Sequence, residues 1–402
     1  MLNVDKIRED FPILNTGVIY LDSAASSLTP KIVLDKMLEY YLTYRSNIER
    51  GLYEFSQRAS EEYEVTRKTI ADFLGAKSPD EIVFVKNTTE AINTIAHSLS
   101  FRKGDKIVTT LLEHHSNLLP WMRCKERYGA KVELIKPSVE GLFDLSDFEK
   151  AIDDKTKIVA IAHVSNVLGV ITPVKEIAEI AHEHGALMLV DGAQSAPHMK
   201  IDVKSIGCDF FAFSGHKMCG PTGSGGFYVR EELIKTLNPI YVGGGTVDLV
   251  DLDEFKLKDS PSKFEAGTPP IAEVIGLKAA VEYLTSIGIE KIEHHEKKLS
   301  ERIYEGLLEI PGVEVYGPEP KFKLGVTSFN IANLSPHDVA LILDSTARIA
   351  VRSGMHCAQP LVRHVLGKPQ GTVRASTYLY NKNEEIEKFL SIVKETSRSA
   401  GG

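Results

Sequence analysis

The segment Asp209-Phe-Phe-Ala-Phe-Ser-Gly-His-Lys217 decides the fold, together with Leu187-Met-Leu-Val-Asp191 upstream. Each is a short apolar run that ends in polar side chains, the pattern of a buried strand followed by a loop. In a mainly parallel sheet these polar residues meet at the carboxyl edge, where ligands bind. A lone lysine in a loop usually faces solvent, but Lys217 ends the predicted strand that follows Asp191. We therefore predict that both side chains belong to one site.

Strand and helix patterns alternate outward from this segment. Residues 173–184 carry apolar side chains at helical spacing, and Gly185 is a plausible stop. Buried strands are predicted at residues 81–85, 106–109, 131–135, 157–161 and 187–190. This alternation predicts an α/β fold with a mainly parallel sheet covered by helices on both faces.

The second half of the chain has a different pattern. Residues 243–270 are rich in Gly, Pro and acidic residues and are interpreted as a long excursion or hairpin. Residues 271–310 look mostly helical with a break near Gly288, and short strands and a closing helix follow. We predict a large domain of residues 17–281 and a smaller α+β domain formed by residues 1–16 and 282–402.

Bulk composition excludes several classes of function. The 402 residues carry a formal charge of −8, which argues against a general nucleic-acid surface. No apolar run reaches the roughly 20 residues needed to span a bilayer, and the N-terminus lacks the apolar core of a signal peptide. The four cysteines are widely spaced, which disfavours structural zinc and disulfides. We expect a cytoplasmic protein that binds neither membrane nor nucleic acid.

Polar residues after the other strands leave several interpretations open. Asn87-Thr88-Thr89 opens a helix and is either a plain N-cap or an anion site. His114 and His115 are loop residues, a metal pair, or a ring stacked on a flat cofactor. The glycines that follow Lys217 could cradle phosphate, but the order of residues is not that of a P-loop.

Seven motifs in order resemble the class V aminotransferase family of pyridoxal 5′-phosphate (PLP) enzymes, fold type I. The resemblance covers nearly the whole chain and is closest to SufS-type (group II) cysteine desulfurases and selenocysteine lyase-like proteins. The motifs stand at residues 20–25, 113–115, 163–169, 191–194, 214–223, 264–269 and 352–358.

The resemblance implies a cofactor site built around Lys217. This lysine forms a Schiff base with PLP, and Asp191 pairs with the pyridinium nitrogen. His114 stacks on the ring and takes part in catalysis, and Gln194 donates to the phenolate oxygen. The phosphate-contacting positions match Thr88, Thr89, Ser214, His216 and, reaching from the other subunit of a homodimer, Thr268.

The resemblance also implies a site for an amino-acid substrate. Asn166 and Arg374 match the clamp on the substrate carboxylate, a role that suits the planar fork of arginine. Arg352, Ala25 and Arg50 match further residues around the substrate.

Cys357 decides the implied reaction. A desulfurase converts L-cysteine to L-alanine and keeps the sulfur as a persulfide on this cysteine, for transfer to a sulfur-acceptor or iron–sulfur scaffold protein. The chain departs from the family pattern at Met355, where a second histidine is usual, and at Glu49, where relatives tend to carry histidine. Met355 removes one potential proton carrier, and Glu49 adds negative charge near the predicted entrance.

Other functions compete with this interpretation. A selenocysteine lyase acting on L-selenocysteine would use the same site, and an epimerase-like protein or an aminotransferase of the same superfamily is a further alternative. True aminotransferases do not need Cys357, so its presence in the matching loop argues against them. A metal- or nucleotide-binding module and a non-catalytic scaffold are alternatives from other classes. The histidine pairs His182/His184 and His294/His295 fall on predicted surface helices, and no third ligand follows them at useful spacing, so we predict no metal site.

Overall fold

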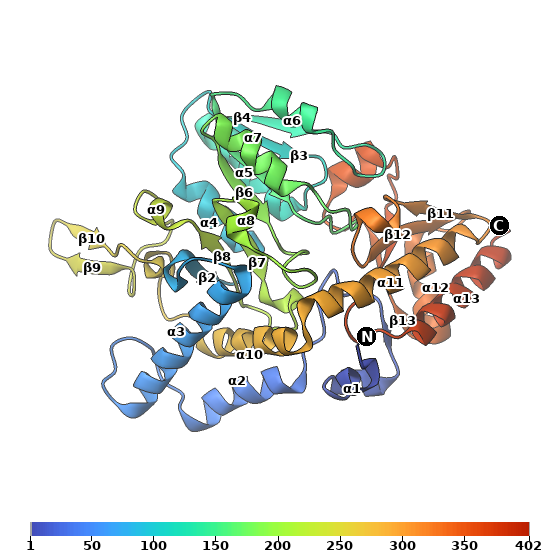
Figure 1. Ribbon diagram of the computed structural model, residues 1–402, viewed down its shortest axis with the longest axis horizontal. Coiled ribbons are helices and arrows are strands. Elements are labelled where there is room, and N and C mark those ends of the chain that lie inside the picture. Colours follow the sequence, from blue (N-terminus) through green and yellow to red (C-terminus); the bar gives the residue numbers. More distant parts are fainter. Residues whose placement is uncertain (1, 402) are drawn as a thin grey trace.

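A mixed sheet forms the centre of the computed structural model, which describes residues 2–401 (Figure 1). Within those residues seven strands lie in the order β2-β8-β7-β6-β5-β3-β4. The strands are β2 (Ile82–Val85), β3 (Lys106–Thr110), β4 (Lys131–Ile135), β5 (Thr156–Ala162), β6 (Leu187–Asp191), β7 (Phe210–Ser214) and β8 (Gly225–Val229). β8 is antiparallel to both neighbours and the other pairs are parallel, which confirms the predicted mainly parallel sheet.

Both faces of the central sheet are buried. Val159 and Ile161 of β5 enter one hydrophobic core, and Ile158 and Ala160 enter a second core on the opposite face. The first core includes side chains from α3 (Glu54–Leu74), α7 (Val174–Glu183) and α10 (Ile271–Ile287). The second includes side chains from α4 (Thr88–Ser98) and α5 (Leu119–Tyr128). Burial on both faces explains why these strands are continuous apolar runs in the sequence.

The strand at residues 131–135 is present, but the prediction that it is buried was wrong. β4 is the last strand of the sheet and pairs only with β3 among the described residues. Lys131, Glu133 and Leu134 are exposed, because an edge strand packs on fewer neighbours than an inner strand.

Several smaller elements flank the central sheet and, together with it and the helices that cover it, form what we call the large region. They are α6 (Leu145–Ala151), α8 (Val203–Ile206), α9 (Glu231–Ile234) and a hairpin of β9 (Val247–Val250) and β10 (Phe255–Leu257). The hairpin projects from the body of the protein at the left of Figure 1, as expected for the Gly- and Pro-rich excursion. The predicted helix break is confirmed at Gly288, between α10 and α11 (Ile289–Leu308), where the backbone has a φ of 97°.

A second, antiparallel sheet lies at the opposite end of the protein (Figure 1). Its order is β11-β12-β15-β14, with β11 (Val313–Tyr316), β12 (Val326–Ile331), β14 (Arg352–Gly354) and β15 (Thr372–Ser376). Helices α11, α12 (Pro336–Ala347) and α13 (Asn383–Ser399) share a hydrophobic core with it. This arrangement confirms the smaller α+β region.

The N-terminal segment contacts both sheet regions. It contains α1 (Val4–Glu9), β1 (Ile19–Tyr20) and α2 (Lys31–Thr43). β1 pairs in parallel with β13 (Ile349–Ala350) beside the second sheet, whereas Ile7 of α1 and Val33 of α2 enter the first core of the central sheet. Arg8 of α1 forms an ion pair with Glu385 of α13 at 2.8 Å. We keep the division between residues 281 and 282 as a proposal; both residues lie inside α10.

None of the helices within residues 2–401 has both the length and the apolar composition needed to cross a bilayer. Over that range, no three His, Cys, Asp or Glu side chains are grouped as potential metal ligands.

A fully buried lysine lies where the two regions meet. Lys323 forms a backbone bridge with Val170, and its Nζ donates to Thr327 Oγ1 at 3.1 Å. Nζ also lies 4.7 Å from the centroid of the Tyr304 ring. Burial lowers the pKa of Lys323 to about 7, because the low-dielectric interior disfavours the ammonium form.

Replacing Lys323 should stabilise the protein, and more so at low pH. The folded chain binds this proton only below about pH 7, whereas the unfolded chain binds it up to a pH near 10.5. Folding with Lys323 therefore becomes less favourable as the pH falls through this window and stays so below it. Lys323→Met should raise stability by on the order of 2 kcal/mol at pH 6.5 and by less at pH 9.5, measured as thermal midpoints.

Exposed Lys321, two residues away, provides the matched control. Lys321→Met should change the midpoint little at either pH, because solvated surface charges contribute little to stability. A gain for Lys323→Met that does not depend on pH would contradict the explanation by buried charge.

Candidate active site

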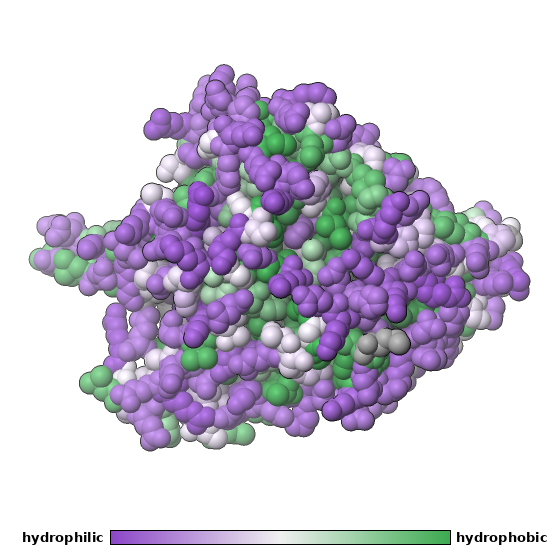
Figure 2. All heavy atoms as spheres, viewed as in Figure 1, coloured by the Kyte–Doolittle hydropathy of each residue, from purple (hydrophilic) through white to green (hydrophobic). Residues whose placement is uncertain are grey.

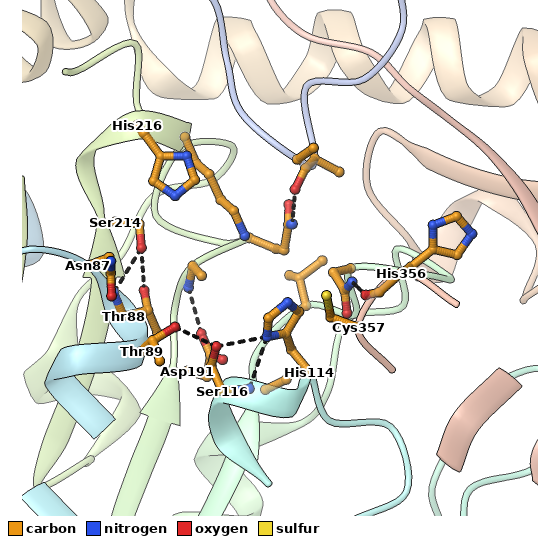
Figure 3. A pocket seen from close by; sticks show the side chains of 18 of the residues that line it. Asn87, Thr88, Thr89, His114, Ser116, Asp191, Ser214, His216, His356 and Cys357 are labelled. Carbon is orange, nitrogen blue, oxygen red and sulfur yellow. Dashed lines mark hydrogen bonds between the residues drawn. The ribbon is translucent and has the colours of Figure 1, made fainter. Parts of the chain in front are cut away.

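A pocket of about 280 Å³ lies at the carboxyl ends of the central strands, beside the second sheet. Residues from distant parts of the chain line it, including loops that follow β2, β3, β5, β6 and β7 and the segment after β14. Figure 3 shows side chains of this pocket. The predicted site residues therefore meet in a pocket at the boundary between the two sheet regions.

Asp191 and Lys217 both line this pocket. Asp191 ends β6, is buried, and accepts a hydrogen bond from Ala193 N at 3.0 Å. Burial raises the pKa of Asp191, while the nearby charge of Lys217 lowers it. Burial lowers the pKa of Lys217 to about 8, against the opposing attraction of Asp191. The pocket thus holds a carboxylate beside an amine that loses its proton more easily than an exposed lysine.

The N-terminus of α4 forms one wall with Ser214 of β7. Asn87 caps the helix by accepting from Glu90 N at 3.0 Å, which confirms the predicted N-cap. Ser214 Oγ accepts from Thr88 N at 2.9 Å and lies 2.7 Å from Thr88 Oγ1 (Figure 3). The wall combines hydroxyl groups with the positive end of an 11-residue helix, a combination suited to an anion.

Glycine at position 225 allows β8 to approach this wall closely. A Cβ atom there would lie 2.9 Å from the Cα of Asn87 and 2.8 Å from the carbonyl oxygen of Phe213. Neither backbone atom can move without shifting the helix cap or the strand. Gly225 therefore helps to position the wall formed by Ser214 and the N-terminus of α4.

His114 lies in the pocket as a neutral ring. Its Nδ1 accepts from Ser116 N at 3.1 Å, and Ser116 Oγ lies 2.9 Å away (Figure 3). The tautomer that accepts at Nδ1 carries its proton on Nε2. Burial and the charge of Lys217 lower the pKa of His114 to about 3, and burial lowers that of His216 to about 4. Both rings are uncharged at neutral pH.

The loop that carries Cys357 closes the opposite side of the pocket from Ser214 and His216 (Figure 3). His356 and Cys357 have φ values of 52° and 54°, in the left-handed region that favours glycine. The large region holds this strained backbone: His115 N donates to Cys357 O, and Asn166 Nδ2 donates to His356 O, both at 2.7 Å. Cys357 itself is exposed, unlike the other three cysteines, which are buried.

Two arginines of the second sheet reach the pocket. Arg374 is 2% exposed, and its Nη1 donates to Asn166 O at 2.8 Å. Its Nη2 donates to Asp22 Oδ1 at 3.0 Å, whereas its buried Nε has no hydrogen-bond partner among residues 2–401. Arg352 lies beside it and also binds Asp22.

The structure brings most of the predicted site residues together. The pocket is lined by Ala25, Thr88, Thr89, His114, Asn166, Asp191, Gln194, Ser214, His216, Lys217, Arg352, Cys357 and Arg374. Arg50 and Thr268 instead line a separate pocket of about 230 Å³ together with Glu49. The role of each residue stays a prediction.

Sequence reasoning gave no role to several residues around this pocket. Ser116 and His356 line it, and Asp22 binds both arginines from behind. Glu113 is fully buried beneath His114 and accepts from Thr110 Oγ1, Asn117 Nδ2 and Ala162 N. Asp22, Glu113 and His356 stand inside the family-like motifs at residues 20–25, 113–115 and 352–358, and a buried acidic residue requires a partner, whereas no motif includes Ser116.

The residues present fit PLP on structural grounds. The buried Asp191 carboxylate can accept from a protonated ring nitrogen, and the wall at Thr88 and Ser214 can hold a phosphate. Gln194 donates to Ala24 O at 2.7 Å, while its buried Oε1 has no partner among the described residues. Its amide can thus still bind a polar group in the pocket.

Comparisons with known proteins agree with this architecture. The sequence model of the family described as aminotransferase class-V matches residues 19–389 of this chain. A protein of Pyrococcus abyssi named probable cysteine desulfurase is 50% identical over 401 residues, covering 98% of both chains.

Solved structures agree as well. The apo structure of a cysteine desulfurase from Thermococcus onnurineus NA1 has a TM-score of 0.95 at 50% identity, covering 99% of both chains. The cysteine desulfurase CsdA from Escherichia coli has a TM-score of 0.92 at 34% identity, covering 98% of both chains. By sequence and by fold, this chain belongs to the class-V aminotransferase family.

Proposed function

We propose that this chain is a PLP-dependent cysteine desulfurase of the SufS type (group II). It converts L-cysteine to L-alanine and holds the released sulfur on Cys357. The observation that carries the proposal is that Lys217, Asp191 and the exposed Cys357 line one pocket. Full-length relatives named probable cysteine desulfurase, 47% and 50% identical, support it.

In this proposal the large region holds the cofactor. PLP supplies an electron sink for bond changes at the substrate α-carbon when it is bound. Asp191 would keep the ring nitrogen protonated, and Gln194 and the neutral His114 would hold the ring. Thr88, Thr89, Ser214 and His216 would hold the phosphate, near the positive end of α4.

Arg374 and Asn166 orient the substrate carboxylate. Arg374 is nearly inaccessible and is fixed by hydrogen bonds on both Nη atoms, while its buried Nε keeps an unused donor. Lys217 moves the α-proton at its Nζ atom. Its pKa of about 8 leaves a useful fraction of neutral amine at neutral pH.

Sulfur transfer takes place at the Sγ atom of Cys357. The thiolate attacks the substrate sulfur and a sulfur–sulfur bond forms, while the carbon–sulfur bond breaks with its electron pair on carbon. A proton on that carbon completes the methyl group of alanine, and Cys357 carries the persulfide. The strained loop fixes the nucleophile in place through His115 and Asn166.

A homodimer is part of this proposal. Thr268 lies outside the pocket in its own chain, as a residue that serves the partner's phosphate would. Large apolar side chains are exposed on the hairpin, and Figure 2 shows hydrophobic atoms at its projecting tip. These residues are Leu249, Val250, Leu252 and Phe255; others are exposed on α2, namely Ile32, Leu34, Leu38, Tyr41 and Leu42. Exposed apolar groups of this extent are typical of an interface.

The proposal extends to partners and location. A sulfur-acceptor or iron–sulfur scaffold protein would take the persulfide from Cys357, and its exposure gives such a partner access. We also propose a cytoplasmic location, since all four cysteines are free thiols. L-selenocysteine is the alternative substrate, because the same groups would bind it.

Lys217→Ala should abolish the visible absorption band of lysine-bound PLP. The substitution also removes the group that moves the α-proton, so alanine formation from L-cysteine should fall by about a hundred-fold or more. Spectra and alanine assays measure both effects. The matched control is Lys204→Ala on the surface, which should leave both unchanged. A wild-type protein that PLP cannot colour would contradict the cofactor assignment.

Cys357→Ser should retain the cofactor band but stop alanine and sulfide formation from L-cysteine. A hydroxyl is far less nucleophilic toward sulfur than a thiolate, so the expected loss is about a hundred-fold or more. Cys208→Ala is the control, because Cys208 is buried in the core away from the pocket. Unchanged alanine formation in Cys357→Ser would make this cysteine structural. Comparing the rate of alanine formation from L-selenocysteine with the rate from L-cysteine would show which substrate the wild-type protein prefers.

A further inference from the structure

Two arginines face each other directly in the second sheet. Arg352 of β14 and Arg374 of β15 are opposite residues in the antiparallel register. Like charges at such positions repel and destabilise strand pairing. This pairing of two arginines is favourable only if a negative group lies between them, and Asp22 is such a group.

The Asp22 carboxylate is shared between the two guanidinium groups. Its Oδ1 accepts from Arg374 Nη2 at 3.0 Å. Its Oδ2 accepts from Arg352 Nη2 at 3.0 Å, and Arg352 Nε lies 3.2 Å from both oxygens. These are charge-assisted hydrogen bonds, which are the strong ones in proteins.

The backbone around Asp22 is fixed from both sides. Asp22 forms a parallel bridge with Ser376, the residue two positions after Arg374. Ser376 N donates to Leu21 O at 2.8 Å, and Ala24 N donates to Ser376 Oγ at 2.9 Å. The carboxylate therefore has a defined position relative to β15 without contribution from a ligand.

This arrangement sets the orientation of Arg374. Its Nη1 binds Asn166 O and its Nη2 binds Asp22, which together fix the plane of the guanidinium. Because the guanidinium plane is fixed, the Nε atom of Arg374, which has no partner among the described residues, has a fixed orientation as well. Asp22 does not itself line the pocket, so it acts through the arginines.

We propose that Asp22 is the positioning residue for the substrate-carboxylate site: it holds Arg374 in its binding orientation and keeps Arg352 from displacing it. This inference rests on the proposed function, in which Arg374 binds the carboxylate of an amino acid. One carboxylate on two guanidiniums leaves one net positive charge, which a substrate carboxylate can neutralise. Loss of Asp22 should therefore weaken ligands that carry a carboxylate and spare those that lack one.

The test compares two ligands that differ only in this group. L-Alanine and ethylamine are titrated into PLP-loaded wild-type protein and Asp22→Asn, and binding is followed by the cofactor spectrum. Asp22→Asn should weaken L-alanine by about ten-fold or more and ethylamine by less than about two-fold, because the lost bonds are charge-assisted. The KM for L-cysteine should rise similarly, with kcat changed less.

Two further variants complete the experiment. Asp22→Glu keeps the charge and should recover part of the L-alanine affinity; it also provides the comparison if Asp22→Asn does not fold. Glu387→Gln removes a carboxylate that binds Arg302 elsewhere on the surface and should leave both ligands unchanged.

The inference would be overturned by equal weakening of both ligands in the folded variants, or by unchanged L-alanine binding. A tighter L-alanine complex in Asp22→Asn would also overturn it, since Asp22 would then compete with the substrate. Failure of the proposed function gives a different result, because wild-type protein would then not turn over L-cysteine at all.

Discussion

The burial of Asp191 at the end of β6 is the constraint on which the site depends. A carboxylate at a buried strand end is costly unless a positive group lies near it, and Lys217, in the turn that follows the neighbouring strand β7, is a positive group whose charge lowers the pKa of Asp191. The parallel register of β6 and β7 places both side chains at the same edge. Burial of the same site lowers the pKa of Lys217 to about 8 despite the opposing charge of Asp191, so part of this amine is neutral at neutral pH.

The second sheet adds what the first cannot supply. Parallel strands with a helix N-terminus give an anion wall and a carboxylate, whereas the antiparallel sheet contributes Arg374 and the loop with Cys357. The two halves are connected by hydrogen bonds from Asn166 and His115 to that loop. Arg374 and Cys357 therefore share one support, which fits the proposed reaction, in which the carboxylate and the sulfur belong to one small molecule.

Much of this fold could be predicted because its inner strands are buried on both faces and form continuous apolar runs. The edge strand β4 broke that rule, since its exposed residues follow from its position in the sheet and not from local pattern. The motifs predicted most of the pocket lining. They missed the role of Asp22, because its partners Arg352 and Arg374 lie more than 300 positions away and sequence spacing does not show such contacts. Arg50 and Thr268 lie outside the pocket of their own chain, so a single chain leaves their roles as predictions.

The central claim is that sulfur from the substrate is held on Cys357. Peptide mass spectrometry of PLP-loaded protein after a single turnover with L-cysteine tests it most directly. The peptide that contains Cys357 should carry one added sulfur atom, in an amount equal to the alanine formed. Alanine formation without sulfur on Cys357, or with the sulfur on one of the three buried cysteines, would contradict it.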